Sequence, residues 1–437
     1  MDERRTAATD VVRRLRAAGY ESYLAGGCVR DRLLGRVPAD YDVATAAPPE
    51  AVQRLFPRTV PVGAQFGVIL VLHGGGRFEV ATFRSDDAYV DGRRPSRVHF
   101  GSAREDAQRR DFTLNALFWD PLDDRIIDFV GGEADLRAGI IRAIGDAAAR
   151  IAEDRLRMLR AVRFAARFGF AIEPATQAAV VAAAPTLVDI AGERIGDEVV
   201  KLLTEGGARR GVELLAETGL LEVVLPEVAR LRGVAQSPDF HPEGDVFTHT
   251  LLLLQQLPAG APETLALGAL LHDVGKPACA RAHGDRITFY GHPAVGAEIA
   301  VAVCQRLRRS RAVWERVAAL VRDHLRLVQA PEMRVSTLKR LLAQEGFDEL
   351  LWLARLDALA SNGDLGYVLF CERRRAELTA EGLRPPRLLG GDDLIALGHP
   401  PGPRLGEILR ALEEAQLEGD VRTREEAVRF VRARFPG

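Results

Sequence analysis

Hydrophobic positions in the first 135 residues change between helical and strand spacing. Val11, Val12 and Leu15 recur at helical spacing within residues 2–18, which predicts an amphipathic helix. Short apolar runs at 23–25, 59–63, 68–72, 78–83 and 125–130 predict strands, and the glycines at 74–76 predict a hairpin. A short helix is expected at 48–56. The pattern therefore predicts an α+β domain over residues 1–135, in which a mixed sheet carries helices.

From residue 138 onward the apolar positions follow helical spacing almost throughout. We expect an all-α remainder with three parts: residues 136–235, 236–365 and 366–437, the last ending in an arginine-rich helix. The chain contains no apolar run near 18 residues and no charged-then-apolar leader, so neither a membrane span nor a signal peptide is predicted. The four cysteines show no CxxC spacing, which favours a reducing, cytoplasmic setting.

The net charge of the chain gives little information about function, but its basic residues are unusual in type. The net charge of −2 does not indicate a nucleic-acid-binding protein, but a balanced total can hide a basic patch. Only three of the 59 basic residues are lysine. The remainder are arginines, whose planar forks suit phosphate groups and base edges.

The segment at 23–45, YLAGGCVRDRLLGRVPADYDVAT, concentrates candidate chemistry. Gly26 and Gly27 follow a predicted strand and open a predicted helix near Val29, where free amides favour an anion such as phosphate. Asp40 and Asp42 follow as an i, i+2 pair, and in a strand both side chains would share one face. Two carboxylates held in this way predict a Mg²⁺ site, since this ion combines carboxylate oxygens with water and substrate phosphates.

Two later motifs extend this pattern. RRDFTLN at 109–115 predicts a helix start capped by Asp111, with Phe112 and Leu114 turned inward. EDRLRMLRAVRF at 153–164 predicts a continuous helix that carries Asp154 and three arginines on one side. Those motifs, together with GG-x-V-R-D and D-x-D, resemble the nucleotidyltransferase core of the polymerase-β superfamily. Within it they most resemble the bacterial class II tRNA CCA-adding enzymes and poly(A) polymerases.

The resemblance implies a role for each matched residue. Asp40 and Asp42 would bind Mg²⁺, and Glu79, on a predicted strand, would be the third acidic residue. The nucleotide would be held by Gly27, Arg30 and Arg110, with Asp111 and Asn115 supporting the ribose and the preceding loop. Asp154 and Arg157 would read the incoming base as an acceptor beside a donor. Arg160 and Arg163 would reach the phosphates.

Residues 85–100 form a long polar segment that predicts a loop between a strand and a helix. It resembles the flexible loop of CCA-adding and A-adding enzymes, and in enzymes that stop after two cytidines this loop is shortened. Gly92 would act as a hinge, and Asp91, Arg93 and Arg94 would engage the helix that reads the base. We therefore expect this chain to add the terminal adenosine.

A second constellation lies between residues 245 and 360. Its histidines and aspartates follow the order H…HD…H…H…D on five predicted helices, which resembles the HD phosphohydrolase superfamily. Neutral imidazoles and carboxylates bind divalent transition metals. The expected ligands are His249, His272, Asp273, His292, His324 and Asp357.

The sequence therefore predicts an enzyme that adds CCA, or its terminal A, to the 3′ end of tRNA from CTP and ATP without a nucleic-acid template. A poly(A) polymerase, a CC-only enzyme and an A-only enzyme remain alternatives within the same class. An HD-type metal-dependent phosphohydrolase and a non-catalytic RNA-binding protein are alternatives from other classes. The expected partners are tRNA, CTP and ATP, with no membrane, and the oligomeric state stays open.

Overall fold

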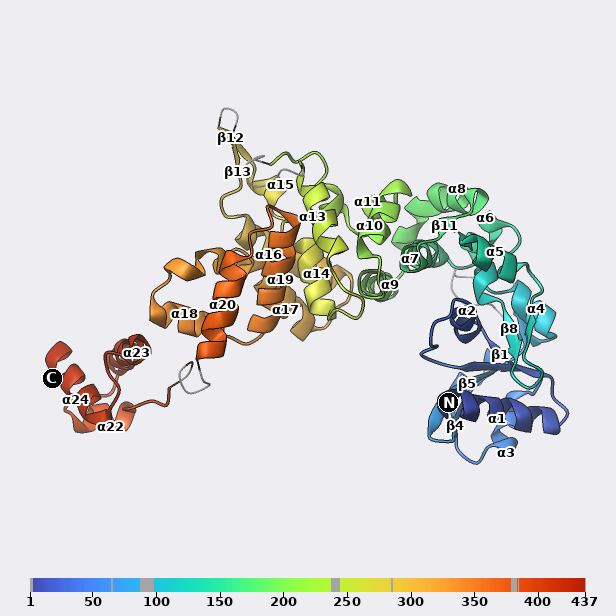
Figure 1. The fold of residues 1–437 in the computed structure, drawn as a ribbon, viewed down its shortest axis with the longest axis horizontal. Coiled ribbons are helices and arrows are strands. Elements are labelled where there is room, and N and C mark those ends of the chain that lie inside the picture. The colour runs from blue at the N-terminus through green and yellow to red at the C-terminus, as the bar shows by residue number, and fades with distance from the viewer. Residues whose placement is uncertain are drawn as a thin grey trace. The chain divides into compact units, whose positions relative to one another are not determined.

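The computed structural model describes residues 3–63, 66–86, 98–236, 244–283, 286–378, 383 and 385–436. The chain divides into two compact units, Met1–Ala229 and Arg230–Gly437, and Figure 1 labels many of their helices and strands. The first unit joins a mixed sheet to helices and the second is mostly helical, so the expected α+β fold is confirmed. The finer division at 135, 235 and 365 stays a prediction.

A seven-stranded sheet forms the centre of the first unit, in the order β3-β4-β5-β2-β1-β8-β9. Its strands are β1 (Ser22–Ala25), β2 (Asp42–Thr45), β3 (Thr59–Gly63), β4 (Val68–His73), β5 (Gly76–Thr82), β8 (Phe118–Asp120) and β9 (Arg125–Ile127). All pairings are antiparallel except β2 with β5, which run parallel with Val43 opposite Val80. The hairpin expected around the glycines at 74–76 joins β4 to β5.

Helices pack on both faces of this sheet. One face packs against α1 (Glu3–Ala17) and α3 (Pro49–Leu55), which lie beside β4 and β5 in Figure 1. The other face packs Tyr23, Phe83 and Phe118 against Ala103 and Ala107 of α4 (Ala103–Gln108). The side chains of β4 and β5 alternate between buried and more exposed positions, so this part of the sheet leaves one face partly open, and Glu79 lies on that face.

The remaining helices of the first unit are α2 (Gly27–Leu33), α5 (Gly132–Ala138), α6 (Ala147–Glu153), α7 (Arg157–Phe168), α8 (Pro174–Ala183), α9 (Gly192–Thr204), α10 (Ala208–Glu217), α11 (Leu220–Val224) and α12 (Pro226–Ala229), with 3₁₀ turns η2 (Thr113–Asn115) and η3 (Ala184–Asp189). Of these helices, α2 lies between β1 and β2, and α5 to α12 come after β9 in the chain. Two short ladders pair β6 (Arg84–Asp86) with β7 (Val98–Phe100), and β10 (Ile140–Ile141) with β11 (Ala171–Ile172).

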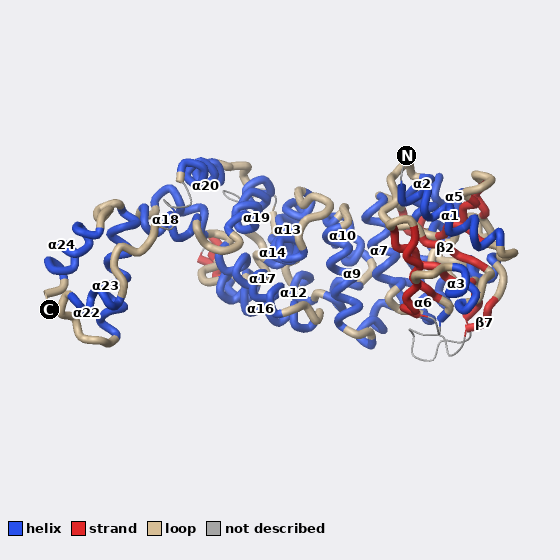
Figure 2. The backbone as a smooth tube through the Cα atoms, turned by 90° about the horizontal axis from the view of Figure 1, so that it is seen from below, coloured by secondary structure: helices blue, strands red, loops and turns tan. Residues whose placement is uncertain are grey.

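In the part of the second unit that the structure describes, the regular structure is helical apart from the hairpin β12 (Arg281–His283) and β13 (Arg286–Thr288), as the colours of Figure 2 show. Its helices are α13 (Val246–Gln255), α14 (Glu263–Leu271), α15 (Lys276–Cys279), α16 (His292–Arg306), α17 (Arg311–Asp323), η4 (Arg326–Glu332), α18 (Val335–Leu342), α19 (Phe347–Ala360), α20 (Gly366–Glu377), α22 (Gly391–Ala396), α23 (Pro403–Glu418) and α24 (Arg424–Arg434). The last three share a separate small core around Ile408 and Leu412.

Two expected helices differ in the structure. Asp111 caps no helix: α4 ends before it at Gln108, and only a single 3₁₀ turn follows, because the Asp111 carboxylate binds Arg160 and Asn115 instead of a helix start. The segment 153–164 is not one helix either. The backbone at Asp154 is extended (φ −144°, ψ 103°), so α6 ends at Glu153 and α7 starts at Arg157. No helix within the described residues is long and apolar enough to span a membrane.

Candidate active sites of the two units

The first unit contains a cavity of about 460 Å³ between the end of the sheet and helix α7. Six arginines and three aspartates contribute to its walls, so the cavity is strongly basic although the whole chain is nearly neutral. Guanidinium groups in excess over carboxylates favour a polyanion such as a triphosphate. The lining residues are Gly26, Gly27, Arg30, Asp42, Arg84, Arg109, Arg110, Asp111, Asn115, Asp154, Arg157, Arg160 and Phe164.

Gly26 joins β1 to α2 at the edge of this cavity. Its φ of 69° lies in the left-handed region, and a Cβ added there would lie only 3.0 Å from Nη1 of Arg110. Arg110 reaches this point by donating to the carbonyl of Asn115 (2.9 Å) and to the Asp106 carboxylate (3.0 Å). The turn therefore requires glycine for both its backbone conformation and the close approach of Arg110.

Asp42 and Glu79 occupy matched positions on neighbouring strands. Because Val43 lies opposite Val80 in the parallel pair β2–β5, the preceding residues Asp42 and Glu79 are also side by side. Asp42 is accessible to solvent within the cavity. Desolvation, helped by the charges of Glu79 and Asp40 and opposed by Arg110, raises the pKa of Asp42 to about 6. Carboxylates that repel each other in this way suit a bound cation.

Asp40 lies just outside β2 and lines a separate cavity of about 270 Å³ with Arg4 and Tyr41. The oxygens of Asp40, Asp42 and Glu79 do not form a group within 4.8 Å of one another, in contrast to the groups in the second unit described below. The structure therefore places Asp42 and Glu79 together and Asp40 beside them.

Asp154 and Arg157 both line the cavity, each held by a different partner. The Asp154 carboxylate accepts from Nη2 of Arg194 at 3.0 and 3.2 Å and from the backbone amide of Leu156 at 3.1 Å. Arg157 donates to Glu153 at 2.6 Å and to the carbonyl of Arg150 at 2.7 Å. An acceptor and a donor are thus fixed side by side on the wall of the cavity.

A chain of contacts joins the glycine turn to helix α7. Arg30 donates to Oδ1 of Asn115 (2.7 Å), Asn115 donates to Asp111 (3.1 Å), and Arg160 donates to Asp111 at 2.8 and 2.5 Å. Burial alone would raise the pKa of Asp111, but Arg160 and the hydrogen bonds outweigh it and lower the pKa to about 2. Asp111 is therefore an ionised structural anchor for Arg160.

Arg163 lies outside the cavity. Its guanidinium is buried and donates to Glu198 (2.7 Å) and Glu205 (2.8 Å) of the segment around α9. Its expected contact with phosphate would require these pairs to break, since one guanidinium cannot serve both at once.

The expected loop falls mostly outside the described residues. Positions 87–97, with Asp91, Gly92, Arg93 and Arg94, are among those not described. The ends that are described pair as an antiparallel ladder, with Arg84 opposite Phe100, and Arg84 lines the cavity.

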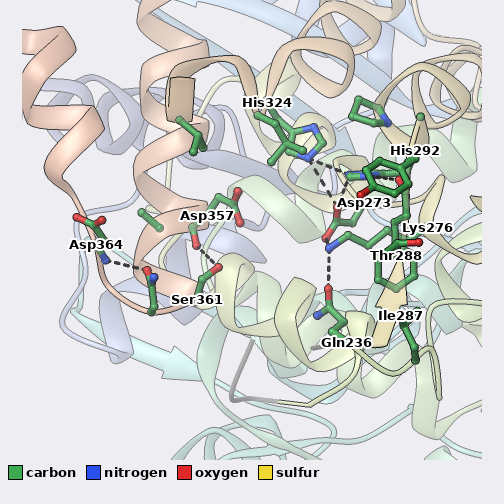
Figure 3. A pocket seen from close by; sticks show the side chains of 18 of the residues that line it. Gln236, Asp273, Lys276, Ile287, Thr288, His292, His324, Asp357, Ser361 and Asp364 are labelled. Carbon is green, nitrogen blue, oxygen red and sulfur yellow. Dashed lines mark hydrogen bonds and ion pairs between the residues drawn. The ribbon is translucent and has the colours of Figure 1, made fainter. Parts of the chain in front are cut away.

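The second unit contains a larger pocket, of about 620 Å³, into which Asp273, His292, His324 and Asp357 project (Figure 3). The six expected ligands form two groups of three whose ligand atoms lie within 4.8 Å of one another: His249, His272 and Asp357, and Asp273, His292 and His324. In the first group, Nε2 of His249 lies 3.2 Å from Nε2 of His272 and 3.0 Å from Asp357. In the second, Nε2 of His292 lies 3.4 Å from Nε2 of His324 and 3.3 Å from Asp273.

Three of the four histidines are oriented for metal binding by a hydrogen bond at Nδ1. His272, His292 and His324 each have Nδ1 within 2.7–2.9 Å of the backbone carbonyl three residues earlier, so Nδ1 carries the proton and Nε2 points inward with its lone pair. Burial lowers the pKa of His324 to about 4, so this imidazole is neutral at pH 7. The donor set of four imidazoles and two carboxylates therefore fits divalent transition metals.

Asp273 lies between the two groups. Its Oδ1 faces His292 and its Oδ2 faces His272 at 3.2 Å. Burial would raise the pKa of Asp273, but Lys276 and His272 outweigh it, so the pKa is well below its ordinary value. Lys276 itself bridges Asp273 (2.7 Å) and Gln236 (2.6 Å), as Figure 3 shows.

Sequence reasoning missed several residues that complete these sites. Gln236 and Lys276 have no role in the expected ligand set, although Lys276 lies three residues after Asp273 in HDVGK. Two contacts were also missed: Arg194, 40 residues from Asp154, donates to the Asp154 carboxylate, and the backbone carbonyl of Arg150 accepts from Arg157, seven residues away. The spacing of charges along one helix contains no signal for such long-range pairs.

Three family models match the chain. They are the poly A polymerase head domain at residues 22–142, the probable RNA and SrmB-binding site of polymerase A at 169–231, and the HD domain at 245–361. These matches confirm the expected resemblance to the family of CCA-adding enzymes and poly(A) polymerases, and to HD proteins.

The two relatives and the solved structure described here are all CCA-adding enzymes. The chain is 32% identical over 431 residues to a CCA-adding enzyme of Lactobacillus johnsonii, covering 97% of this chain and 96% of that protein. It is 47% identical over 223 residues to a CCA-adding enzyme of Geobacillus stearothermophilus, where the aligned region is 51% of this chain and spans only 55% of the relative. A crystal structure of the Bacillus stearothermophilus CCA-adding enzyme in complex with CTP matches with a TM-score of 0.77 and 30% identity, covering 99% and 98% of the two chains.

Proposed function

Because this chain belongs to the family of CCA-adding enzymes, we propose that it adds CCA to the 3′ end of tRNA from CTP and ATP. The 3′ hydroxyl of tRNA would attack the α-phosphate of the nucleotide, and pyrophosphate would leave. The observation that carries this proposal is the basic cavity that brings Asp42, the glycine turn and the Asp154–Arg157 pair together.

Each group of residues at the cavity would have a separate role in this reaction. Asp40 and Asp42, with Glu79 beside them, would hold Mg²⁺, which would lower the pKa of the hydroxyl and offset developing negative charge. Gly27, Arg30 and Arg110 would bind the triphosphate, and Arg160, oriented by Asp111, would extend this basic wall. Asp154 and Arg157 would accept and donate hydrogen bonds at the base edge. Cytosine and adenine both present an amino group, which suits a carboxylate, whereas uracil and guanine present a carbonyl.

The test uses a tRNA that lacks all three terminal nucleotides. With CTP and ATP the wild-type enzyme should extend it by three nucleotides and stop, and Asp42→Ala should reduce this activity by orders of magnitude while circular dichroism stays unchanged. A run of adenosines longer than one would instead identify a poly(A) polymerase. Normal addition by Asp42→Ala would contradict the proposed Mg²⁺ site.

The two groups of ligand atoms in the second unit favour a second function, metal-dependent hydrolysis of phosphate esters. His249, His272 and Asp357 would hold one divalent cation and Asp273, His292 and His324 another, with Asp273 between them. Cations held there would act as Lewis acids toward a phosphate ester and activate water. Lys276 would orient Asp273 and contribute a positive charge to the pocket. Metal analysis of protein purified without chelator, with bis-p-nitrophenyl phosphate hydrolysis, tests this function; a metal-free, inactive wild type that stays inactive when Mn²⁺ or Ni²⁺ is added would refute it.

A further inference from the structure

We propose that Arg194 is a positioning residue for base selection, holding the carboxylate of Asp154 in the orientation that reads an amino group. This inference rests on the proposed base-reading role of Asp154. Arg194 lies in the first turn of α9, 40 residues after Asp154 in the sequence.

Asp154 lies in a position that needs such a support. It sits in the break between α6 and α7, where the backbone is extended and no helix constrains the side chain. One hydrogen bond, from the amide of Leu156 to Oδ1, would leave the carboxylate free to rotate. Nη2 of Arg194 contacts both oxygens, at 3.2 and 3.0 Å, and thereby fixes the plane of the carboxylate.

Counting acceptor sites shows what this contact leaves free. An ionised carboxylate has about four lone-pair directions. Arg194 uses one on each oxygen and Leu156 uses another on Oδ1, so the remaining acceptor direction is on Oδ2. That single site can accept from the amino group of cytosine or adenine and repels the carbonyl of uracil or guanine.

Arg194 contacts Asp154 but does not itself line the cavity. Asp154 lines the cavity, whereas Arg194 is absent from the described residues that line it. Both side chains are mostly buried, with exposed fractions of 19% for Asp154 and 21% for Arg194. Arg194 is therefore placed to act through Asp154, without contact with the nucleotide.

Ion pairs between α7 and the α9 segment hold the two helices together, so the backbone that carries Arg194 has a defined position. Glu198, one turn further along α9, binds Arg163 of α7 at 2.7 Å, and Glu205 binds Arg163 and Arg167 at 2.8 and 3.0 Å. These ion pairs form a row between α7 and α9, and we call this interface the α7–α9 seam. The Arg194–Asp154 pair lies at the end of the row nearest the cavity. A structural role in this seam is the alternative that an experiment must separate from positioning.

The chain offers two matched controls. Arg155 neighbours Asp154 and forms an ion pair with Asp189 at 2.5 Å, but neither residue lines the cavity. Arg155→Ala therefore removes an ion pair next to Asp154 without touching the Asp154 carboxylate. Glu198→Gln weakens the α7–α9 seam one turn away from Arg194 and leaves the Arg194–Asp154 pair intact.

The experiment measures kcat/KM of the full-length enzyme for CTP, ATP, UTP and GTP on matched tRNA acceptors, with melting temperatures for every variant. Arg194→Ala should lower the CTP-to-UTP ratio by about tenfold or more, since a charged hydrogen bond to Asp154 is lost. Arg194→Lys, which keeps the charge, should recover part of the ratio. Arg155→Ala and Glu198→Gln should keep the wild-type ratio, whatever their melting temperatures.

A double-mutant cycle completes the test. In an Asp154→Ala background the Arg194→Ala substitution should no longer change the CTP-to-UTP ratio, because its effect passes through the missing carboxylate. If Arg194→Ala slows all four nucleotides equally, or if Glu198→Gln relaxes selectivity as much, the positioning role is wrong. If Asp154→Ala itself leaves selectivity unchanged, the proposed base-reading role fails first, which distinguishes the two failures.

Discussion

Asp111→Asn should destabilise the first unit by about 2 kcal/mol at pH 7. Asp111 is 8% exposed and accepts hydrogen bonds from Arg160, Asn115 and the backbone amide of Phe112. These contacts lower its pKa from 3.8 to about 2. At about 1.4 kcal/mol per pKa unit, that difference corresponds to about 2 kcal/mol of stability, which an uncharged asparagine cannot supply.

The pH dependence has a defined sign. The pKa of Asp111 is lower in the folded state, so its contribution is complete above the unfolded value near 3.8 and is lost as the pH falls through about 2. The difference between wild type and Asp111→Asn should therefore be constant from pH 7 to pH 5 and should fall to roughly half by pH 3.

Urea unfolding followed by tryptophan fluorescence provides the assay. With Trp314 and Trp352 replaced by phenylalanine, the signal comes from Trp119 in the first unit. Asp189→Asn is the control: its pair with Arg155 has the same 2.5 Å separation, but the aspartate side chain is 61% exposed. Exposed pairs contribute about 0.5 kcal/mol or less. Equal losses in both variants, or a difference that does not change between pH 7 and pH 3, would refute the assignment of stability to the buried pair.

Three further outcomes are expected. Asp40→Ala should reduce nucleotide addition by orders of magnitude without unfolding the enzyme, and near-normal rates in both Asp40→Ala and Asp42→Ala would exclude this pair as the metal site. Arg157→Ala should relax discrimination among the four nucleoside triphosphates, because a site built on hydrogen bonds rejects wrong bases by leaving polar groups unpaired; unchanged selectivity would contradict this. His272→Ala combined with Asp273→Ala should abolish metal binding and hydrolysis in the second unit but leave nucleotide addition intact, and a parallel loss of addition would show that the two sites are not separable.

The sequence predicted the glycine turn and most strands of the sheet, because alternation and Gly-Gly spacing are local signals, but it did not predict β8. The strands at 59–63 and 68–73 and the hairpin between β4 and β5 follow from residues close in sequence. The pairing of β2 with β5, which brings Glu79 beside Asp42, joins strands separated by residues 46–75, and local pattern cannot specify such a pairing.

The helix break at Asp154 shows the opposite case. Residues 153–164 have continuous helical spacing, and the sequence alone gave no reason to interrupt it. The interruption depends on Arg194 and on the Leu156 amide, which bind the Asp154 carboxylate in its extended conformation. Likewise, the six ligands of the second unit were predicted from residue types, but their division into two groups depends on how five helices pack.

The most direct test of the proposed function uses a tRNA that already ends in CC, supplied with ATP alone. A long polar segment at 85–100 separates Arg84 from the RRDFTLN motif. In the proposed function, the Asp154–Arg157 edge would accept adenine as well as cytosine. The account predicts the addition of one adenosine and then arrest, with no addition when UTP or GTP replaces ATP. Absence of adenosine addition, while two cytidines are still added to a tRNA lacking all three nucleotides, would contradict it.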